Sequence, residues 1–351
     1  MRKSFFEYLG LADVERIHSQ FLAWVLSSDC IAIDLKEREE LFENLFNANG
    51  KITDIQTERN GIDILIATSS DVIIIENKIK SSQHSNQLEK YKEFCNTEFP
   101  NHHKHFYFLT LIDEKTNDKD WHRLTYSVIL KHLSKLKLTL DNNHSAIIKE
   151  YLIFLERLES VVLDFKANTK KYDMVFLDGK KKKQDKRRSD YNSENEWFVA
   201  ANQLETILQK SFLNLLVEQV KNPIGSISDT RGVALVDFPI QRDIEFERRK
   251  YSTALQLQVD TIKLTFAIQS VPYQQSDKSW IENAIPVMMK LSKQNNFRYN
   301  KVNKPKQLAY ISISKKLDWH YWHMPIVELA NFINTEINNC RLMTTELKLL
   351  L

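Results

Sequence analysis

Three residues in the first quarter of the chain combine two carboxylates with an amine: Asp63, Glu76 and Lys78. The segment VIIIENKI has the isoleucine-rich composition of a buried strand, and side chains alternate between the two faces of a strand. Glu76 and Lys78 therefore share one face, whereas Asn77 points to the other. A short turn connects this strand to the preceding one, which carries Asp63. The pattern predicts two carboxylates that converge beside one ammonium group.

Converging carboxylates favour a bound cation. Two carboxylates about 4 Å apart repel each other by roughly 4 kcal/mol at an effective dielectric constant of 20. Mg²⁺ suits such a site, because it is a hard ion that takes one or two carboxylates, several waters and substrate phosphate oxygens. Mn²⁺ is the alternative ion. Lys78 would orient or deprotonate the attacking water and offset charge in the transition state, so the chemistry implied is phosphodiester hydrolysis.

The segments around these residues predict a layer of helices and strands. The turn signals Asn60-Gly61 and TSSD separate runs that are rich in isoleucine. The order helix, three strands, helix, strand, helix predicts an α/β fold with a mixed sheet flanked by helices. We expect helices over residues 13–27, 36–46, 81–94, 127–138 and 144–162, and strands over 52–58, 62–67, 72–79 and 105–112.

Several motifs resemble those of a known family. Asp63, twelve intervening residues and Glu76-Asn77-Lys78 resemble the signature of PD-(D/E)XK, or restriction-endonuclease-like, nucleases. The helix ERIHSQFLAWVL (15–26) is similar to the first motif of a mostly bacterial subfamily. QLEKY (87–91) resembles the QxxxY motif of RecB-type nucleases. The segment WHRLTYSVILKHL (121–133) is similar in position and character to a further segment of the subfamily. The five elements occur in the expected order.

The resemblance implies a set of metal ligands. Asp63 and Glu76 would bind the ion, and the main-chain carbonyl of Asn77 would complete its shell. Glu15 is the expected third acidic group, with a surface helix glutamate as the alternative interpretation. Glu58 competes for the same role from the edge of the strand that precedes Asp63.

The resemblance covers residues 12–165 and also implies catalytic roles. Lys78 would be the catalytic lysine. Gln87 and Tyr91 lie one helical turn apart, so both can face the site and position it or the nucleic-acid backbone. Tyr91 as an ordinary half-buried helix residue stays an alternative. Ile62 stands where the family signature has proline, a departure that removes no chemical group.

Composition excludes several other classes of protein. The six glycines are not spaced as a P-loop or GxGxxG nucleotide site requires. Cys30, Cys95 and Cys340 are odd in number and far apart, so neither a disulfide framework nor a cysteine zinc site is expected. Because there is no signal-peptide core and no apolar run of roughly 20 residues, we expect a cytoplasmic protein without membrane contact.

The length of 351 residues predicts more than one core. We expect a nuclease domain over residues 1–165, a basic linker over 166–193 and a separate α+β domain over 194–351. The linker contains KKKKQDKRR, either an exposed run or a segment that contacts phosphate. WHYWH (319–323) is expected to pack in the second core rather than stack on bases. Helices are predicted there over 194–221, 280–293 and 325–339, and strands over 232–240, 253–260, 261–269 and 307–314.

The leading hypothesis is a Mg²⁺-dependent nuclease that acts on nucleic acid, on DNA rather than RNA, in defence against foreign DNA or in DNA repair. The net charge of +3 is too small to identify that partner by itself. Two alternatives remain: a catalytically silent nucleic-acid-binding module on the same fold, and a protein-interaction component. The C-terminal domain would recognise substrate, a protein partner or a second copy of the chain.

Overall fold

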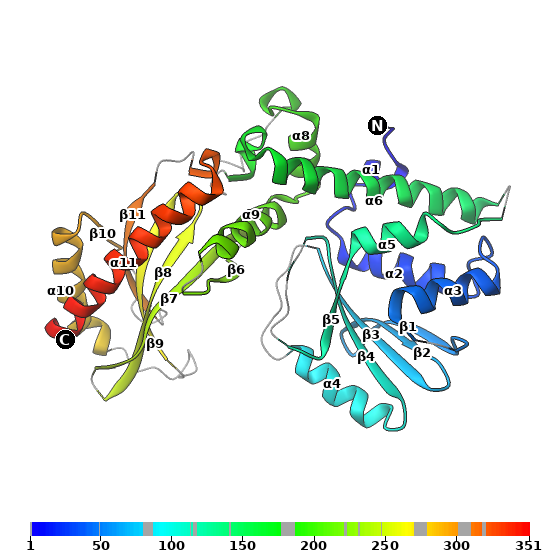
Figure 1. Ribbon diagram of the computed structural model, residues 1–351, viewed down its shortest axis with the longest axis horizontal. Coiled ribbons are helices and arrows are strands. Elements are labelled where there is room, and N and C mark those ends of the chain that lie inside the picture. Colours follow the sequence, from blue (N-terminus) through cyan, green and yellow to red (C-terminus); the bar gives the residue numbers. More distant parts are fainter. Residues whose placement is uncertain are drawn as a thin grey trace. The chain divides into compact units, whose positions relative to one another are not determined.

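The chain forms two compact units in the computed structural model (Figure 1). The N-terminal unit comprises Met1–Asn168 and Tyr191–Leu208, and the C-terminal unit comprises Thr169–Asp190 and Gln209–Leu351. The structure describes residues 2–48, 50–79, 87–112, 114, 118–139, 142–176, 187–220, 223–230, 232–246, 248–269, 279–300, 310–317 and 321–351.

A five-stranded mixed sheet with the order β1-β2-β3-β4-β5 forms the middle of the N-terminal unit. Strands β1, β2 and β3 are antiparallel neighbours, whereas β3, β4 and β5 run parallel. The sequence analysis missed β5, which is short and has exposed residues at its centre. The bounds are Asp54–Arg59 for β1, Ile62–Ala67 for β2, Asp71–Lys78 for β3, His103–Thr110 for β4 and Trp121–Thr125 for β5.

Helices cover both faces of this sheet (Figure 1). Helix α2 contacts β1, β2 and β3 on one face, and α4 packs on the other face through a shared apolar core. The predicted α/β fold, a mixed sheet flanked by helices, is confirmed. The helices of the unit are α1 Phe5–Tyr8, α2 Glu15–Leu26, α3 Leu35–Phe46, α4 Gln87–Glu98, α5 Tyr126–Leu133, α6 Asn143–Ala167 and α8 Glu194–Ala201.

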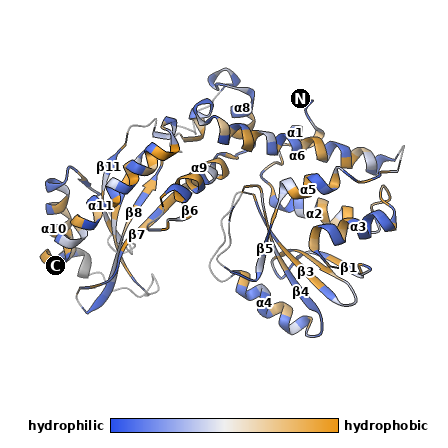
Figure 2. Cartoon of the chain, in the orientation of Figure 1, coloured by the Kyte–Doolittle hydropathy of each residue, from blue (hydrophilic) through white to orange (hydrophobic). Residues whose placement is uncertain are grey.

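The core between the sheet and α4 follows from strand alternation. Val72 and Ile74 of β3 point to the same side as Leu88 and Cys95 of α4, and all four are buried. On the opposite face, the Tyr107 hydroxyl donates to the main-chain carbonyl at the end of α3. Figure 2 shows hydrophobic and hydrophilic residues mixed along α3, as expected for a helix with one buried side. Both faces of β3 are therefore buried.

A six-stranded antiparallel sheet forms the C-terminal unit, in the order β10-β11-β9-β8-β7-β6. Helix α11 contacts β7 and β8, and α10 contacts β10 and β11. This confirms a second α+β fold. Its elements are α9 Glu205–Gln219, β6 Ser226–Thr230, β7 Val233–Phe246, β8 Arg249–Gln258, β9 Thr261–Ile268, α10 Ser279–Gln294, β10 Arg298–Tyr299, β11 Tyr310–Lys316 and α11 Ile326–Leu350.

Part of the predicted linker is folded into the C-terminal unit. Residues 169–171 and 173–176 form short 3₁₀ helices. The Phe176 ring stacks on Trp322 with ring centroids 4.5 Å apart, and Thr169 donates to the Trp322 carbonyl. The prediction of a linker did not anticipate this packing. The few apolar residues among many lysines are buried here because Trp322, far along the chain, packs against them. The lysine run itself, 180–186, lies outside the described residues.

The segment after the linker packs on the N-terminal unit. Asn195 donates to the Asp164 carboxylate at 2.7 Å, and the Arg157 guanidinium lies over the Phe198 ring. The units therefore differ from the predicted limits of 1–165, 166–193 and 194–351. The predicted single helix over 194–221 is also two helices, separated at Gln203, whose φ of 53° is incompatible with a continuous helix.

The three cysteines are buried free thiols, in agreement with the sequence analysis. Tyr321 and Trp322 are buried in the C-terminal unit, as predicted for the aromatic cluster; Trp319 and His320 lie outside the described residues. In the described part of the chain, no helix is both long and apolar enough to cross a membrane.

The central position of β3 leads to a stability prediction. Ile74 is fully buried against α4, so Ile74→Ala should lower the free energy of unfolding by about 2–5 kcal/mol in urea titrations followed by circular dichroism. Ile31→Ala is the matched control, because Ile31 is 64% exposed and should change stability by less than about 0.5 kcal/mol. Equal unfolding midpoints for the two variants would contradict the placement of β3.

Candidate active site

Strand β3 presents different side chains to the two faces of the sheet. Val72 and Ile74 contact α4, and alternation continues this face through Glu76 and Lys78. The exposed fractions of Glu76 and Lys78 are 1% and 8%. Asn77, which points the opposite way, is fully buried. The predicted face for each of these residues is confirmed.

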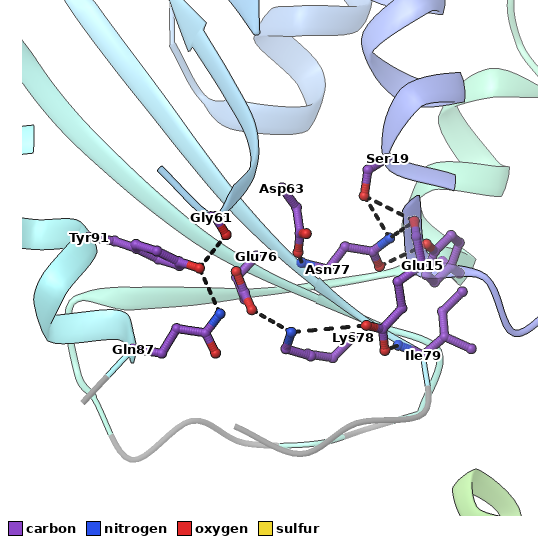
Figure 3. A network of polar contacts seen from close by, with 11 residues as sticks. Glu15, Ser19, Gly61, Asp63, Glu76, Asn77, Lys78, Ile79, Gln87 and Tyr91 are labelled. Carbon is purple, nitrogen blue, oxygen red and sulfur yellow. Dashed lines mark hydrogen bonds and ion pairs between the residues drawn. The ribbon is translucent and has the colours of Figure 1, made fainter. Parts of the chain in front are cut away.

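Asp63 on β2 lies beside this strand (Figure 3). Ile64 pairs with Ile75 in the antiparallel register, and one further step places Asp63 opposite Glu76. The backbone N–H of Asn77 donates to Asp63 Oδ2 at 2.6 Å. Burial and the neighbouring Glu76 charge raise the pKa of Asp63 to about 7, although this hydrogen bond and Lys78 oppose the shift. The structure brings the two predicted carboxylates together.

Glu76 and Lys78 form a buried ion pair. Lys78 Nζ lies 2.5 Å from Glu76 Oε1. Burial raises the pKa of Glu76 despite the lysine. Burial alone would lower the pKa of Lys78, but the charge of Glu76, followed by Glu15 and Asp63, raises it above the ordinary value. Lys78 is therefore a charged ammonium group in this arrangement.

Glu15, at the start of α2, reaches the end of β3 (Figure 3). Its Oε1 accepts from the backbone N–H of Ile79 at 2.8 Å, and its Oε2 lies 4.0 Å from Lys78 Nζ. The competing candidate, Glu58, is exposed on β1 and raises the pKa of Asp63 through its charge. The Glu15 carboxylate therefore contacts Lys78 and the backbone at the end of β3. Its role as a third metal ligand stays a prediction.

Gln87 and Tyr91 contact each other on α4, as their spacing predicts. Gln87 Nε2 donates to the Tyr91 hydroxyl at 2.6 Å, and that hydroxyl donates to the carbonyl of Gly61. Gly61 has a φ of +80°, a conformation that L side chains rarely adopt, so glycine suits this turn. Tyr91 thereby ties α4 to the turn that leads into Asp63.

Asn77 is anchored by residues that the sequence analysis did not identify. Its Nδ2 donates to the main-chain carbonyl of Glu15 at 2.9 Å and to Ser19 Oγ at 3.0 Å. Its Oδ1 accepts from the Tyr126 hydroxyl at 2.8 Å. The polar Asn77 within an isoleucine-rich strand was a signal that partners exist. Which residues they are depends on how α2 and α5 pack on the sheet.

His18, also in the first motif, is a buried structural residue. Its Nδ1 lies 2.7 Å from the Tyr151 hydroxyl, and its ring stacks on Phe154. Burial lowers the pKa of His18 to about 4, although the Ala12 carbonyl and Glu15 oppose the shift. The ring is therefore neutral near pH 7 and helps hold α2 against α6.

The donor set at Asp63 and Glu76 fits a divalent cation. Glu76 Oε1 is ion-paired with Lys78 at 2.5 Å, and the Tyr91 side chain also interacts with this carboxylate. Two carboxylates with a neighbouring carbonyl match the preference of Mg²⁺ or Mn²⁺ for oxygen ligands. No group of three or more His, Cys, Asp or Glu side chains in the described part is arranged to hold a metal ion. Water and phosphate oxygens would have to complete the shell.

Comparison with known proteins agrees with this geometry. The family model described as PD-(D/E)XK nuclease superfamily matches residues 3–223, which is more than half of the chain. The chain belongs to the PD-(D/E)XK nuclease superfamily. Membership supports a nuclease-type hydrolase with a nucleic-acid substrate, in a superfamily whose members generally use divalent metals. No curated protein and no solved structure matches the chain.

The anchor on Asn77 can be tested through stability. Tyr126→Phe removes the donor to a buried carbonyl oxygen, so the free energy of unfolding should fall by about 1–3 kcal/mol. Tyr8→Phe is the matched control because Tyr8 is 76% exposed. Chemical denaturation of both variants measures the difference, and an unchanged Tyr126→Phe protein would show that the hydrogen bond contributes nothing.

The raised pKa of Asp63 predicts how stability depends on pH when EDTA is present. The folded-state pKa of about 7 exceeds the unfolded value of about 3.9, so this group stabilises the fold below about pH 4 and loses that contribution as the pH rises to 7. Asp63→Asn should therefore be more stable than the parent protein at pH 8 and equally stable near pH 4. Thermal unfolding across this range measures it. Exposed Asp29→Asn should show no such trend.

Proposed function

We propose that the protein is a Mg²⁺-dependent nuclease that hydrolyses phosphodiester bonds in DNA, in defence against foreign DNA or in DNA repair in the cytoplasm. The observation that carries this proposal is the pair of buried carboxylates at Asp63 and Glu76, with Lys78 Nζ 2.5 Å from Glu76. Lys78 places one positive charge beside these two carboxylates. A divalent cation would compensate the remaining negative charge.

Asp63, Glu76 and the Asn77 carbonyl would hold the ion, and Glu15 is the further acidic candidate. When bound, a divalent cation supplies Lewis-acid polarisation of the phosphodiester and neutralises the developing charge. The backbone hydrogen bond from Asn77 to Asp63 orients one carboxylate towards the other strand. The protein therefore presents a ligand set whose geometry is fixed before the ion binds.

Lys78 acts in this proposal as a hydrogen-bond donor and a fixed positive charge. Its raised pKa favours the ammonium form, which can stabilise negative charge on a phosphoryl oxygen and orient a water. Deprotonation of that water by Lys78 would require loss of the ammonium proton, which Glu76 and Glu15 oppose. Gln87 and Tyr91 act as positioning residues, since they tie α4 to the turn that precedes Asp63.

Cleavage assays test the proposal directly. The full-length protein should cut DNA with Mg²⁺ or Mn²⁺ and stop when EDTA is added. Glu76→Gln and Lys78→Ala should each lower the cleavage rate on the order of 100-fold or more, because the first removes a charge that would hold the ion and the second a charge that would act on the transition state. Lys90→Ala is the matched control: Lys90 is exposed on α4, and its variant should cut at the parent rate.

Comparing DNA with RNA as the substrate tests which nucleic acid the protein cleaves. Faster cleavage of DNA than of RNA supports the proposed substrate, and the reverse preference would reassign the enzyme to RNA while keeping its chemistry. Full activity of Lys78→Ala would refute the role of the lysine. Salt-sensitive binding without cleavage of single-stranded or double-stranded DNA or RNA, with either metal, would instead identify a catalytically silent binding module.

A further inference from the structure

The six-stranded sheet of the C-terminal unit has two faces of different character. On one face, Thr253 of β8 accepts from Thr344 of α11, and Lys315 of β11 forms an ion pair of 2.6 Å with Glu336 of the same helix. Figure 1 shows α11 lying across the sheet. Leu255 and Leu264 are fully buried on this face. Helix α11 therefore covers the apolar side.

The opposite face carries a row of polar side chains. Gln256 of β8 pairs in register with Lys263 of β9, Lys263 pairs with Ser314 of β11, and Ser314 pairs with Arg298 of β10. Directly paired residues point to the same side of a sheet. The row thus crosses four strands without an apolar residue. An open groove of about 1020 Å³ lies over β9, β10 and β11.

The groove has a positive character. Lys263, Arg298, Lys315 and Lys316 line it, and none of the described residues that line it is a carboxylate. Lys315 is neutralised from the covered face by Glu336, and Lys316 is paired with Asp260 at 2.9 Å. This leaves Lys263 and Arg298 as the cations that decide the charge of the groove.

Lys263 is held in place by neutral groups. Its Nζ donates to Gln256 Oε1 at 3.2 Å and to Gln258 Oε1 at 3.1 Å. Burial lowers its pKa, and the Asp237 charge only partly opposes this shift. Arg298 is exposed, and neither cation is ion-paired within the described ranges. An anion in the groove would therefore meet two cations, one of them already ordered.

An aromatic ring lies on the same face of β11. Tyr310 precedes Ser314 by four residues, so both point to one side, about 14 Å apart along the strand at roughly 3.4 Å per residue. Tyr310 is 39% exposed, and its partner across β9 is the small residue Ala267. Its ring is accessible for stacking from the open side.

We propose that this groove binds single-stranded nucleic acid, with backbone phosphates at Lys263 and Arg298 and a base stacked on Tyr310. Cationic side chains beside an exposed aromatic ring are the combination that binds unpaired strands, whose base faces are accessible. A duplex hides those faces, so the tyrosine favours a single strand. The inference deepens the proposed function, because it gives the nuclease a second substrate contact outside its active site.

Fluorescence anisotropy with a labelled 20-nucleotide oligothymidine tests this inference. The full-length chain is used in EDTA, so that no cleavage occurs. The double variant Lys263→Gln with Arg298→Ala should bind at least about tenfold more weakly, and its log–log salt slope should be shallower by about 1.4, or 0.7 for each lost phosphate contact. Tyr310→Leu should weaken binding at least about fivefold.

Matched controls lie on α11. Arg341→Ala and Lys348→Gln remove exposed cations from the helix that covers the other face, and they should bind as tightly as the parent protein. Circular dichroism melting confirms that each variant is folded. Affinity and salt slope unchanged in the groove double variant would overturn the inference. The assignment to a single strand would be overturned if Tyr310→Leu bound the oligothymidine as tightly as the parent protein and the groove double variant lost as much affinity for duplex DNA as for the single strand.

The outcome separates this inference from the proposed function. Groove-dependent binding without any cleavage in Mg²⁺ would refute the nuclease and leave the groove standing. Metal-dependent cleavage, with binding that does not change when Lys263 and Arg298 are replaced, would support the nuclease and refute the groove.

Discussion

The hydrogen bond from the backbone N–H of Asn77 to the Asp63 carboxylate is the contact on which the site depends. It joins the C-terminal end of β3 to β2, one residue after Glu76. The Asn77 side chain is held at the same time by α2 and by Tyr126 of α5. Because neighbouring side chains of a strand point in opposite directions, fixing Asn77 on one face fixes Glu76 and Lys78 on the other.

Buried charge explains why this anchoring is elaborate. Burial raises the pKa of both carboxyl groups, and the charge of Glu76 raises that of Asp63 further, which destabilises their charged forms. Lys78 forms an ion pair with Glu76, and its charge opposes the raised pKa of Asp63 only in part. His18 of α2 adds no positive charge near pH 7, because burial lowers its pKa to about 4. A divalent cation would complete the charge balance of a site that is otherwise rigidly held.

The two faces of the six-stranded sheet in the C-terminal unit differ in character. Antiparallel sheets can bury one face and expose the other, so alternate residues of β8, β9 and β11 serve different purposes. Leu255 and its partner Leu264 pack in the core, whereas Lys263 and Ser314 belong to the polar row. Strand β3 differs, because both of its faces are buried: the face that carries Glu76 and Lys78 also packs on α4 through Val72 and Ile74.

The spacing of residues along short stretches of the sequence predicted several features of the fold and of the site. The α/β class, the shared face of Glu76 and Lys78, and the contact between Gln87 and Tyr91 follow from periods of two or about 3.6 residues, which act over short stretches of chain. The domain limits did not follow, because Phe176 is buried only when Trp322, 146 residues later, completes its core.

Tertiary structure alone decided which residues complete each site. Ser19 and Tyr126 lie 58 and 49 positions from Asn77, and Arg298 joins Lys263 only through the register of β11. No local period encodes such distances. Contacts of this kind depend on how helices dock on a sheet and on which strands become neighbours, and both are settled by the packing of the whole core.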